Sequence, residues 1–196
     1  MNRDILSSLR PALVMTVLFA LLLGLAYPLA ITGLGQFLFP AQAGGSLIAE
    51  RGRIVGSSVV GQAFVTERYF HTRPSAAGKG YDGLASSGSN LGPASRVLAE
   101  RVGGDIHALQ TAAPGRPVPS DLVTTSASGL DPDISPEAAL YQVDRVARVR
   151  NLDRAAVETL VEQSVERPIL GFLGEPRVNV LMLNRRLDAI GRKPVP

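Results

Sequence analysis

Two serines in a small polar loop are the hydroxyl groups of this chain that could act as nucleophiles. The stretch SSGSNLGP, residues 86–93, carries Ser87 and Ser89. Loops of this composition hold phosphates, carry nucleophiles or simply turn the chain. Neither serine lies in a GxSxG sequence, and only His71 and His107 are available as an imidazole base. The sequence therefore favours a turn, and the alternative is a membrane-anchored exported hydrolase that uses Ser87 or Ser89 with His71.

The sequence lacks the usual motifs of metal-binding and nucleotide-binding sites. The chain has no cysteine, which excludes thiolate metal sites and thiol nucleophiles. Asp121, Asp131 and Asp133 could surround a hard cation, but LDPDISP, residues 130–136, lacks the ligand spacing and the glycine of an EF-hand loop, so a turn that leads into a helix explains it better. The chain contains neither a GxxxxGK[ST] sequence nor the kinase motifs. We therefore expect no catalytic residues, no metal site and no cofactor of the chain's own.

Two expected helices that meet at Asn151-Leu152 carry several arginines, an arrangement that could serve a helix-turn-helix DNA reader. The chain as a whole has 20 basic and 17 acidic residues, dispersed singly, and a net charge of +3. A nucleic-acid interface would gather its basic residues into a stripe. We interpret the pair as a helical hairpin with solvated arginines and expect no nucleic-acid partner. The arginines are Arg145, Arg148, Arg150 and Arg154.

The elements that must position all these residues begin with a long apolar run. No Asp, Glu, Lys or Arg occurs from Pro11 to Ala49. About 20 apolar residues suffice for a helix to cross the hydrocarbon of a bilayer. We therefore predict a transmembrane helix over residues 11–34, surrounded by membrane lipids. Small residues allow close packing against partner helices, and the candidates here are Gly24, Gly33 and Gly35.

The orientation of this helix follows from the basic residues beside it. Two arginines lie in the leading tail, residues 1–10, which we expect in the cytoplasm. A linker over residues 35–46 then leads to an extracytoplasmic domain, residues 47–196. Ala41-Gln42-Ala43 is typical of a signal-peptidase site, but the apolar run is about twice as long as the apolar region of a signal peptide. We therefore expect an uncleaved single-pass anchor.

The domain after the anchor is predicted to be a mixed α/β module of the α+β class. A hairpin that turns at Arg51-Gly52 opens it, and residues 66–93 form a long irregular segment of the kind that binds partners. A helix follows over residues 94–109, which Gly103-Gly104 is expected to break into two turns. The β-branched stretch LVTT, residues 122–125, is predicted to be a short strand.

Three further helices are expected to close the domain. Ser135 is the N-cap of the first, with Pro136 at its first position, and Asp153 is the N-cap of the second, which Pro168 ends. The third lies within residues 175–190, where helical spacing outweighs a short β-like run. The apolar stripes expected in the core are Leu140, Val143, Val146 and Ala147 on the first helix, Val157, Leu160 and Val161 on the second, and Val180, Leu183, Leu187 and Ile190 on the third.

Five long segments cover much of the chain in a fixed order: VGSSVVGQAF (55–64), YFHTRPSA (69–76), YDGLASSGSNLGP (81–93), DLVTTSASGLDPDISPEAALYQVDRVAR (121–148) and LGEPRVNVLMLN (173–184). Together with the single amino-terminal span they resemble the C subunit of the Kdp-type potassium-transporting P-type ATPase. The resemblance implies a complex of the bacterial inner membrane. Its partners would be a potassium-selective channel-like subunit, an ATP-hydrolysing P-type subunit and a small additional membrane subunit.

The same resemblance implies a non-catalytic subunit whose family is described as a catalytic chaperone that raises the ATP affinity of the pump subunit. ATP and potassium would then be handled by the complex. Residues 87–90, SGSN, are similar to the LSGGQ sequence with which ABC ATPases touch nucleotide, but ATP is cytoplasmic and the loop is expected in the periplasm. We therefore expect an indirect effect on ATP affinity, a coupling of about 1–3 kcal/mol.

We call residues 81–93 the polar loop. This loop, beside Tyr69, exposes groups that suit a protein interface. We predict that this loop is used for folding or for docking on a partner subunit. The candidate interface residues are Tyr81, Asp82, Ser87, Gly88, Ser89, Asn90, Leu91, Gly92 and Pro93.

Overall fold

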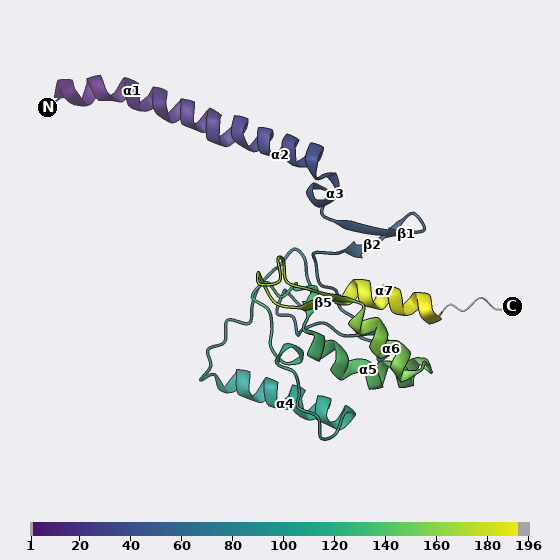
Figure 1. The fold of residues 1–196 in the computed structure, drawn as a ribbon. Helices are drawn as coiled ribbons and strands as arrows, with labels where there is room; N and C mark the ends of the chain where they lie inside the picture. The colour runs from purple at the N-terminus through teal and green to yellow at the C-terminus, as the bar shows by residue number, and fades with distance from the viewer. Residues whose placement is uncertain (1, 192–196) are drawn as a thin grey trace. The chain divides into compact units, whose positions relative to one another are not determined.

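The computed structural model describes the backbone of residues 2–191 and the side chains of residues 7–190 (Figure 1). The first residue of the predicted tail and residues 192–196 of the predicted domain lie outside this range. The chain divides between Leu47 and Ile48 into two compact units. Helices and small sheets make up the second unit, so the prediction of an α+β architecture behind an apolar N-terminal helix is confirmed.

A continuous helical run makes up most of the first unit. It consists of α1 (Asn2–Leu21), the π-helical segment η1 (Leu22–Ala26) and α2 (Tyr27–Leu38). Among the described residues one helix, Ser7–Leu38, is long and apolar enough to cross a membrane, and its most apolar window has no buried residue. Water is an unfavourable environment for so much exposed apolar surface. The helix is therefore compatible with a membrane anchor.

This helix continues past its predicted end at residue 34. The N–H of Phe39 still donates to the carbonyl four residues back at 2.8 Å. Phe39 itself leaves the helical conformation, with φ −135°, because the following Pro40 disfavours that conformation in the residue before it. Pro40 then begins the one-turn helix α3 (Pro40–Ala43). Much of the stretch expected to be a linker, residues 35–46, is thus helical.

A two-stranded ribbon follows, made of β1 (Leu47–Glu50) and β2 (Arg53–Ser57). Its turn lies at Arg51 and Gly52, whose φ values are 51° and 78°. Two successive positive φ values are typical of the type I′ turn that joins strands through two residues. The predicted hairpin is confirmed.

The remaining strands form a small antiparallel sheet in the order β3–β5–β4. They are β3 (Asp133–Ile134), β4 (Val165–Glu166) and β5 (Arg177–Asn179). Val178 in the central strand pairs with Ile134 on one side and Val165 on the other, and it is fully buried. The sheet therefore contributes its middle strand to the core.

The predicted strand at residues 122–125 is wrong. Leu122 ends the 3-10 turn η2 (Ser120–Leu122), and the carbonyl of Ser120 accepts from Val123 N, Thr124 N and Thr124 Oγ1 at 3.1, 2.9 and 2.7 Å. These local bonds satisfy backbone groups that a strand would offer to a neighbour. The apolar residues of the stretch, Leu122 and Val123, are nevertheless buried. Burial, not strand pairing, explains why they are apolar.

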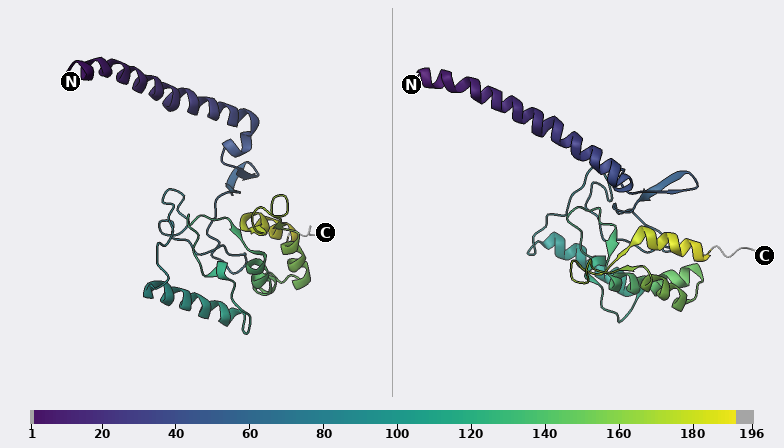
Figure 2. Two further views of the ribbon diagram at one scale, coloured as in Figure 1. Left: turned by 60° about the vertical axis from the view of Figure 1, so that its left-hand side comes forward. Right: turned by 45° about the horizontal axis from the view of Figure 1, so that its top comes forward.

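The predicted break at Gly103-Gly104 is also wrong, because α4 (Arg96–Ala112) is continuous. Ser95 is its N-cap and accepts from Leu98 N at 3.4 Å. Each glycine costs about 1 kcal/mol relative to alanine in a helix. An ion pair between Arg101 and Asp105, one turn apart at 2.8 Å, spans the two glycines. Figures 1 and 2 show α4 to one side of the other helices of this unit, and Tyr141 of one of those helices donates to Leu109 O of α4 at 3.0 Å.

These other helices are α5 (Pro136–Arg150), α6 (Arg154–Glu162) and α7 (Val180–Gly191). Ser135 accepts from Ala138 N at 3.2 Å, as an N-cap does. Asp153 takes the N-cap position of α6 without a side-chain bond, and α6 ends well before Pro168. The third predicted helix begins later than expected because β5 takes its first residues.

The core lies between these three helices, the sheet and Phe70 of the irregular segment. The predicted stripes of α5, α6 and α7 supply most of it, although Leu140 is only partly buried and Ile190 is 38% exposed. Predicted stripe residues in the buried cluster are Val143, Val146, Ala147, Val157, Leu160, Val161, Val180, Leu183 and Leu187.

Candidate functional site

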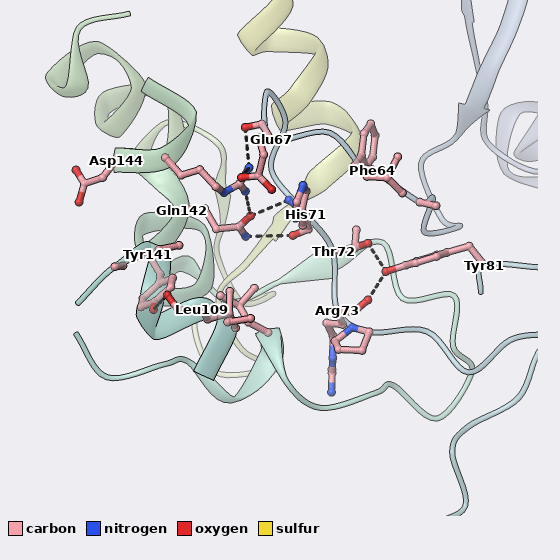
Figure 3. A pocket seen from close by; sticks show the side chains of 18 residues that line it. Phe64, Glu67, His71, Thr72, Arg73, Tyr81, Leu109, Tyr141, Gln142 and Asp144 are labelled. Atoms are coloured by element: carbon pink, nitrogen blue, oxygen red, sulfur yellow. Dashed lines mark hydrogen bonds and ion pairs between the residues drawn. The ribbon is translucent and has the colours of Figure 1, made fainter. Parts of the chain in front are cut away.

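Two buried side-chain amides fasten the irregular segment to the helices. We call residues 64–77 the strap. Asn184 of α7 accepts from Phe70 N and donates to Phe70 O, both at 2.9 Å. Gln142 of α5 does the same for the next residue, accepting from His71 N at 2.8 Å and donating to His71 O at 3.1 Å (Figure 3). The strap therefore satisfies its buried backbone without belonging to a sheet.

Arg145 of α5 reinforces this attachment. Its guanidinium donates to the carbonyls of Glu67 and Tyr69 at 2.7 and 3.0 Å, and to Gln142 Oε1 at 2.7 Å. The side chain is only 11% exposed and lies 3.5 Å from the carboxylate of Glu67. Burial lowers the pKa of Arg145, and the Glu67 carboxylate opposes that shift. We had expected Arg145 to face water, and the strap carbonyls explain why it does not.

Arg150, near the end of the same helix, is buried further, at 6% exposure. It donates to Arg68 O at 2.8 Å, lies over the Tyr69 ring at 4.9 Å and pairs with Asp188 of α7. Tyr69 OH donates to the same carboxylate at 3.1 Å. Burial raises the pKa of Tyr69, and the bond to Asp188 adds to the rise. The predicted helical hairpin is confirmed, but two of its four arginines hold the strap.

The other two arginines of the hairpin do face solvent. Arg148 is exposed, and Arg154 forms surface ion pairs with Asp144 and Glu158, both at 2.6 Å. Exposed ion pairs of this kind contribute little to stability. The expectation of solvated arginines therefore holds for this half of the set.

Tyr81 marks the start of the candidate interface loop and is itself well fixed. Its N–H donates to Ser75 Oγ at 2.8 Å, and its hydroxyl bonds to Thr72 Oγ1 and to the carbonyl of Arg73 (Figure 3). It adopts φ 56°, a conformation unusual for a bulky residue. Burial raises the pKa of the Tyr81 hydroxyl. The side chain thus joins the loop to the strap.

The middle of the loop is held by a second irregular segment, residues 126–129. Ser87 N and Ser86 Oγ both donate to Ser128 O, at 3.0 and 2.9 Å. The contact is tight, because a Cβ on Gly129 would lie 2.5 Å from Ser87 O, and one on Gly88 would lie 3.0 Å from a carbonyl of the second segment. Residues 86–88 are therefore set against the body of the domain.

Beyond this point the loop is largely open to solvent. Ser89 and Leu91 are half-buried, whereas Asn90, with φ 52°, is exposed. Asp82 is exposed and accepts from Leu84 N at 2.9 Å. Gly92 and Pro93 are also exposed and lead into α4. The predicted interface residues thus lie on both sides of the fixed residues 86–88: Tyr81 and Asp82 begin the exposed stretch before them, and Ser89 to Pro93 follow. Their role in docking stays a prediction.

A cavity of about 380 Å³ lies beside the strap. Its walls come from the strap, from α5 and from the inner side of α4, and Tyr81 is the candidate loop residue that lines it (Figure 3). Tyr141 and Leu109 face it from two helices and are joined by a bond of 3.0 Å from the Tyr141 hydroxyl to the Leu109 carbonyl. The lining is mostly apolar, and its polar groups already have partners: Gln142 and Arg145 bond to the strap, and Asp144 pairs with Arg116 and Arg154.

The hydrolase alternative finds no support in this arrangement. Ser87 Oγ donates to the carbonyl of Gly88 at 3.0 Å. His71 Nε2 lies 3.0 Å from Thr66 O, and because a carbonyl only accepts, this nitrogen carries the proton and cannot act as a base. Burial lowers the pKa of His71, and the charge of Arg145 lowers it further. Both groups are thus engaged with backbone rather than with each other.

The three aspartates considered as a cation site serve the local fold. Asp121 accepts from Ser135 N at 2.7 Å, and Asp131 accepts from Asp133 N at 3.0 Å. Asp131 pairs with Arg73 at 3.2 Å, and Asp133 pairs with Arg177 at 3.2 Å. Burial raises the pKa of Asp133. Within the described side chains no cluster of three His, Asp or Glu residues is arranged to hold a metal ion.

The glycines proposed for helix packing are open toward their surroundings. A Cβ added to Gly24, Gly33 or Gly35 would meet nothing within 4 Å. These positions offer room for a partner helix to approach closely. Their packing role stays a prediction.

Sequence reasoning missed the side chains that hold the strap, namely Gln142, Asn184, Arg145 and Arg150. The sequence did indicate that the two amides could be buried, because each lies directly beside a residue of a predicted core stripe. Gln142 lies beside Val143, and Asn184 beside Leu183. A buried amide requires partners, and an irregular segment rich in unpaired backbone groups supplies them.

Known proteins resemble this chain over almost its whole length. The family described as "KdpC: K+-transporting ATPase, c chain" matches residues 9–189. The potassium-transporting ATPase KdpC subunit of Caulobacter vibrioides is 57% identical over 185 residues, covering 94% of each chain. The proteins of that name from Methylorubrum extorquens and Methylobacterium nodulans are 57% and 52% identical over alignments 200 positions long, which cover 96% of this chain and all of theirs.

Proposed function

This chain belongs to the KdpC family, the c chain of the K+-transporting ATPase, and from that premise we propose that it is a non-catalytic subunit that docks on a partner through its polar loop. The partners are the potassium-selective channel-like subunit, the ATP-hydrolysing P-type subunit and a small additional membrane subunit. ATP and potassium are handled by those partners, and this chain needs no cofactor.

The observation that carries the docking proposal is that the protruding loop is fixed at both ends while its tip is free. Tyr81 and residues 86–88 hold the base, and Leu84 between them is fully exposed. A loop already held in one conformation loses little entropy on binding. Long irregular loops of ordered conformation are most often functional. The loop is therefore built to present its tip to a partner.

Replacing Leu84 tests this proposal more cleanly than replacing Ser87 to Asn90. Alanine at Gly88 would crowd a neighbouring carbonyl, and Asn90 has a positive φ, so those changes would disturb the fold. Leu84→Ser removes only exposed surface. We expect it to lower recovery of the assembled complex by about tenfold, the loss of one well-packed apolar contact at an interface, while the melting temperature of the purified chain stays unchanged.

Val97→Ser is the matched control, because Val97 is also an exposed aliphatic residue of the same unit but lies on α4. The control is expected to leave complex recovery intact. Full recovery with Leu84→Ser, or equal losses with both variants, would argue against docking through this loop.

The effect on ATP follows from docking without any contact between this chain and nucleotide. A subunit that binds one conformation of the pump better than another shifts the pump's equilibrium by its difference in affinity. We expect Leu84→Ser to raise the KM for ATP of the complex about 5- to 150-fold, with little change in the rate at saturating ATP. A lower saturated rate at constant KM would instead indicate a defect in the chemical or transport steps.

We further propose that the second unit lies on the periplasmic side of the bacterial inner membrane, with the N-terminus in the cytoplasm. The charge bias of the leading tail supports this orientation. The chain has no cysteine, so Leu84→Cys introduces a single exposed thiol. An impermeant maleimide should label it in intact spheroplasts. Labelling only after the membrane is broken would place the unit in the cytoplasm and would favour direct contact with ATP.

A further inference from the structure

The connection between β4 and β5 carries an exposed group of apolar side chains. We call residues 168–174 the apolar loop. Ile169, Leu170, Phe172 and Leu173 are 69%, 79%, 73% and 53% exposed. None of the four belongs to the buried cluster of the domain. A contiguous apolar surface of this kind on a soluble module marks a site that another surface covers.

The apolar loop is a built structure. Ile169 and Leu173 exchange both backbone hydrogen bonds, at 3.1 and 3.0 Å, and Gly171 N donates to Pro168 O at 3.0 Å. Leu170 and Gly171 adopt positive φ values of 56° and 80°, which close the turn. The N–H groups of Ile169, Gly171, Phe172 and Leu173 thus have partners inside the loop. The remaining tip carbonyls can bond to water and headgroups at the bilayer boundary, so the tip suits that depth and not the hydrocarbon interior.

The base of the apolar loop is held by the sheet. Val165 and Glu166 of β4 pair with Val178 and Arg177 of β5. Arg177 also pairs with the carboxylate of Glu166 at 3.0 Å. The loop thus extends from a fixed two-stranded stem, with charged side chains at the stem and apolar ones at the tip.

The chemistry of the tip fits lipid better than protein. Protein interfaces combine apolar contacts with direct hydrogen bonds, about one for every 100–200 Å² of buried surface. The tip offers two leucines, an isoleucine and a phenylalanine, with no hydrogen-bonding side chain. Apolar side chains next to a charged base are the arrangement of segments that lie in the membrane interface.

A bilayer is also within reach. The helix Ser7–Leu38 is compatible with a membrane anchor, and the connection to the second unit, residues 39–47, spans at most about 30 Å even if fully extended. A domain of this size is about 40 Å across. The bilayer surface is therefore the apolar phase that the tethered domain meets most often, on whichever side of the membrane the domain lies.

We propose that the apolar loop inserts Leu170 and Phe172 into the boundary between the headgroups and the acyl chains of the bilayer that holds the N-terminal helix. The loop is then a second attachment of the domain to the membrane. It limits how the domain can rotate about its tether and so restricts which of its faces can meet a partner.

The test uses the full chain in vesicles of phosphatidylcholine and phosphatidylglycerol. Leu170→Cys is labelled with the environment-sensitive dye NBD, and Leu84→Cys, at the fully exposed tip of the polar loop, is the matched control. We expect the dye at 170 to be quenched about twofold or more by brominated lipids and to resist aqueous iodide. The dye at 84 should respond to iodide alone. Phe172→Cys is measured in parallel, so that a folding defect in one variant does not decide the result.

Equal iodide quenching at 170, 172 and 84 would overturn the proposal. So would protection of 170 and 172 that arises only when the partner subunits are added, because that result assigns the apolar loop to a protein. A further variant, Leu170→Cys with Phe172→Asp, should lose its lipid quenching, since a carboxylate is costly in the interface. These outcomes do not depend on docking through Leu84, which is measured separately by complex recovery.

Discussion

The side-chain amide of Asn184 on α7 makes with the backbone of Phe70 the two hydrogen bonds that a neighbouring strand would make. Gln142 on α5 repeats the arrangement with His71. The strap therefore crosses the helices without regular secondary structure, and its Phe70 ring enters the core. The polar loop and the cavity both depend on this attachment.

Asn184→Leu should destabilise the domain by about 2–4 kcal/mol, because it leaves the N–H and C=O of Phe70 buried without partners. Chemical denaturation of the full chain, followed by circular dichroism, measures the change. Gln110→Leu, an exposed position on α4, is the control and should shift stability by about 0.5 kcal/mol or less. Equal effects would mean that the amide does not hold the strap.

The two amides should be energetically coupled, since they hold adjacent residues of the same strap. When Asn184→Leu has already loosened the strap, fewer native contacts of the strap remain for Gln142→Leu to remove. We expect the double variant to lose about 0.5–3 kcal/mol less than the sum of the single losses. A double-mutant cycle measures this difference. Strict additivity would show that the strap is held at two independent points.

Arg150→Met should cost about 1–3 kcal/mol, because it removes the bond to Arg68 O and leaves the Asp188 carboxylate without its cation. Arg148→Met on the same helix is the control, because Arg148 faces solvent. Thermal unfolding of both variants checks the prediction. If the two melt alike, the buried position of Arg150 contributes nothing to stability.

Gly129→Ala should loosen the polar loop. The added Cβ would lie 2.5 Å from Ser87 O and 2.7 Å from Ala77 N, and the residue has φ 67°. Gly115→Ala is the matched control, because Gly115 also has a positive φ, 77°, but a Cβ there meets nothing within 4 Å. Conformational strain of about 1–2 kcal/mol is common to both. Chemical denaturation measures the stability of both variants, and amide hydrogen exchange measures the protection of Ser87 N–H. A larger loss of stability in Gly129→Ala than in Gly115→Ala, with faster exchange at Ser87, would show the effect of the steric contact.

Stability should rise with pH across the titration of His71. Burial lowers the pKa of His71 below its usual 6.5 in the folded chain, so the unfolded chain takes up a proton at a higher pH than the folded one. The contribution of His71 is therefore fully present above about pH 6.5 and is lost as the pH falls toward the lower folded pKa. The groups that face it are Arg145 and Glu67.

His71→Gln keeps an amide that can donate to Thr66 O and removes the titration. Melting temperatures of the two proteins at pH 5 and pH 7 measure the effect, and the variant should show the smaller rise between them. An identical rise in both would assign the pH dependence to groups other than His71. Asp133 is not such a group, because burial raises its pKa and so makes its contribution to stability fall as the pH rises.

The amino-acid sequence by itself determined the parts of this protein that depend on neighbours along the chain. The apolar run, the cap of α5 at Ser135, the turn at Arg51-Gly52 and the stripes of α5, α6 and α7 all follow from local composition and period. The family resemblance rests on ordered segments of the same linear kind. These features need no knowledge of distant contacts, because the backbone and its nearest side chains already favour them.

Only the tertiary structure decided what the polar residues and the irregular segments do. Arg145 and Arg150 look solvated in sequence, yet strap carbonyls from about 80 residues away surround them. The stretch at Leu122 looks like a strand, yet the bonds of Ser120 and the burial of its apolar side chains settle it as a turn. The physical reason is that a buried polar side chain or backbone group must form a hydrogen bond with a partner that the tertiary fold places beside it. The spacing of residues along the sequence does not identify that partner.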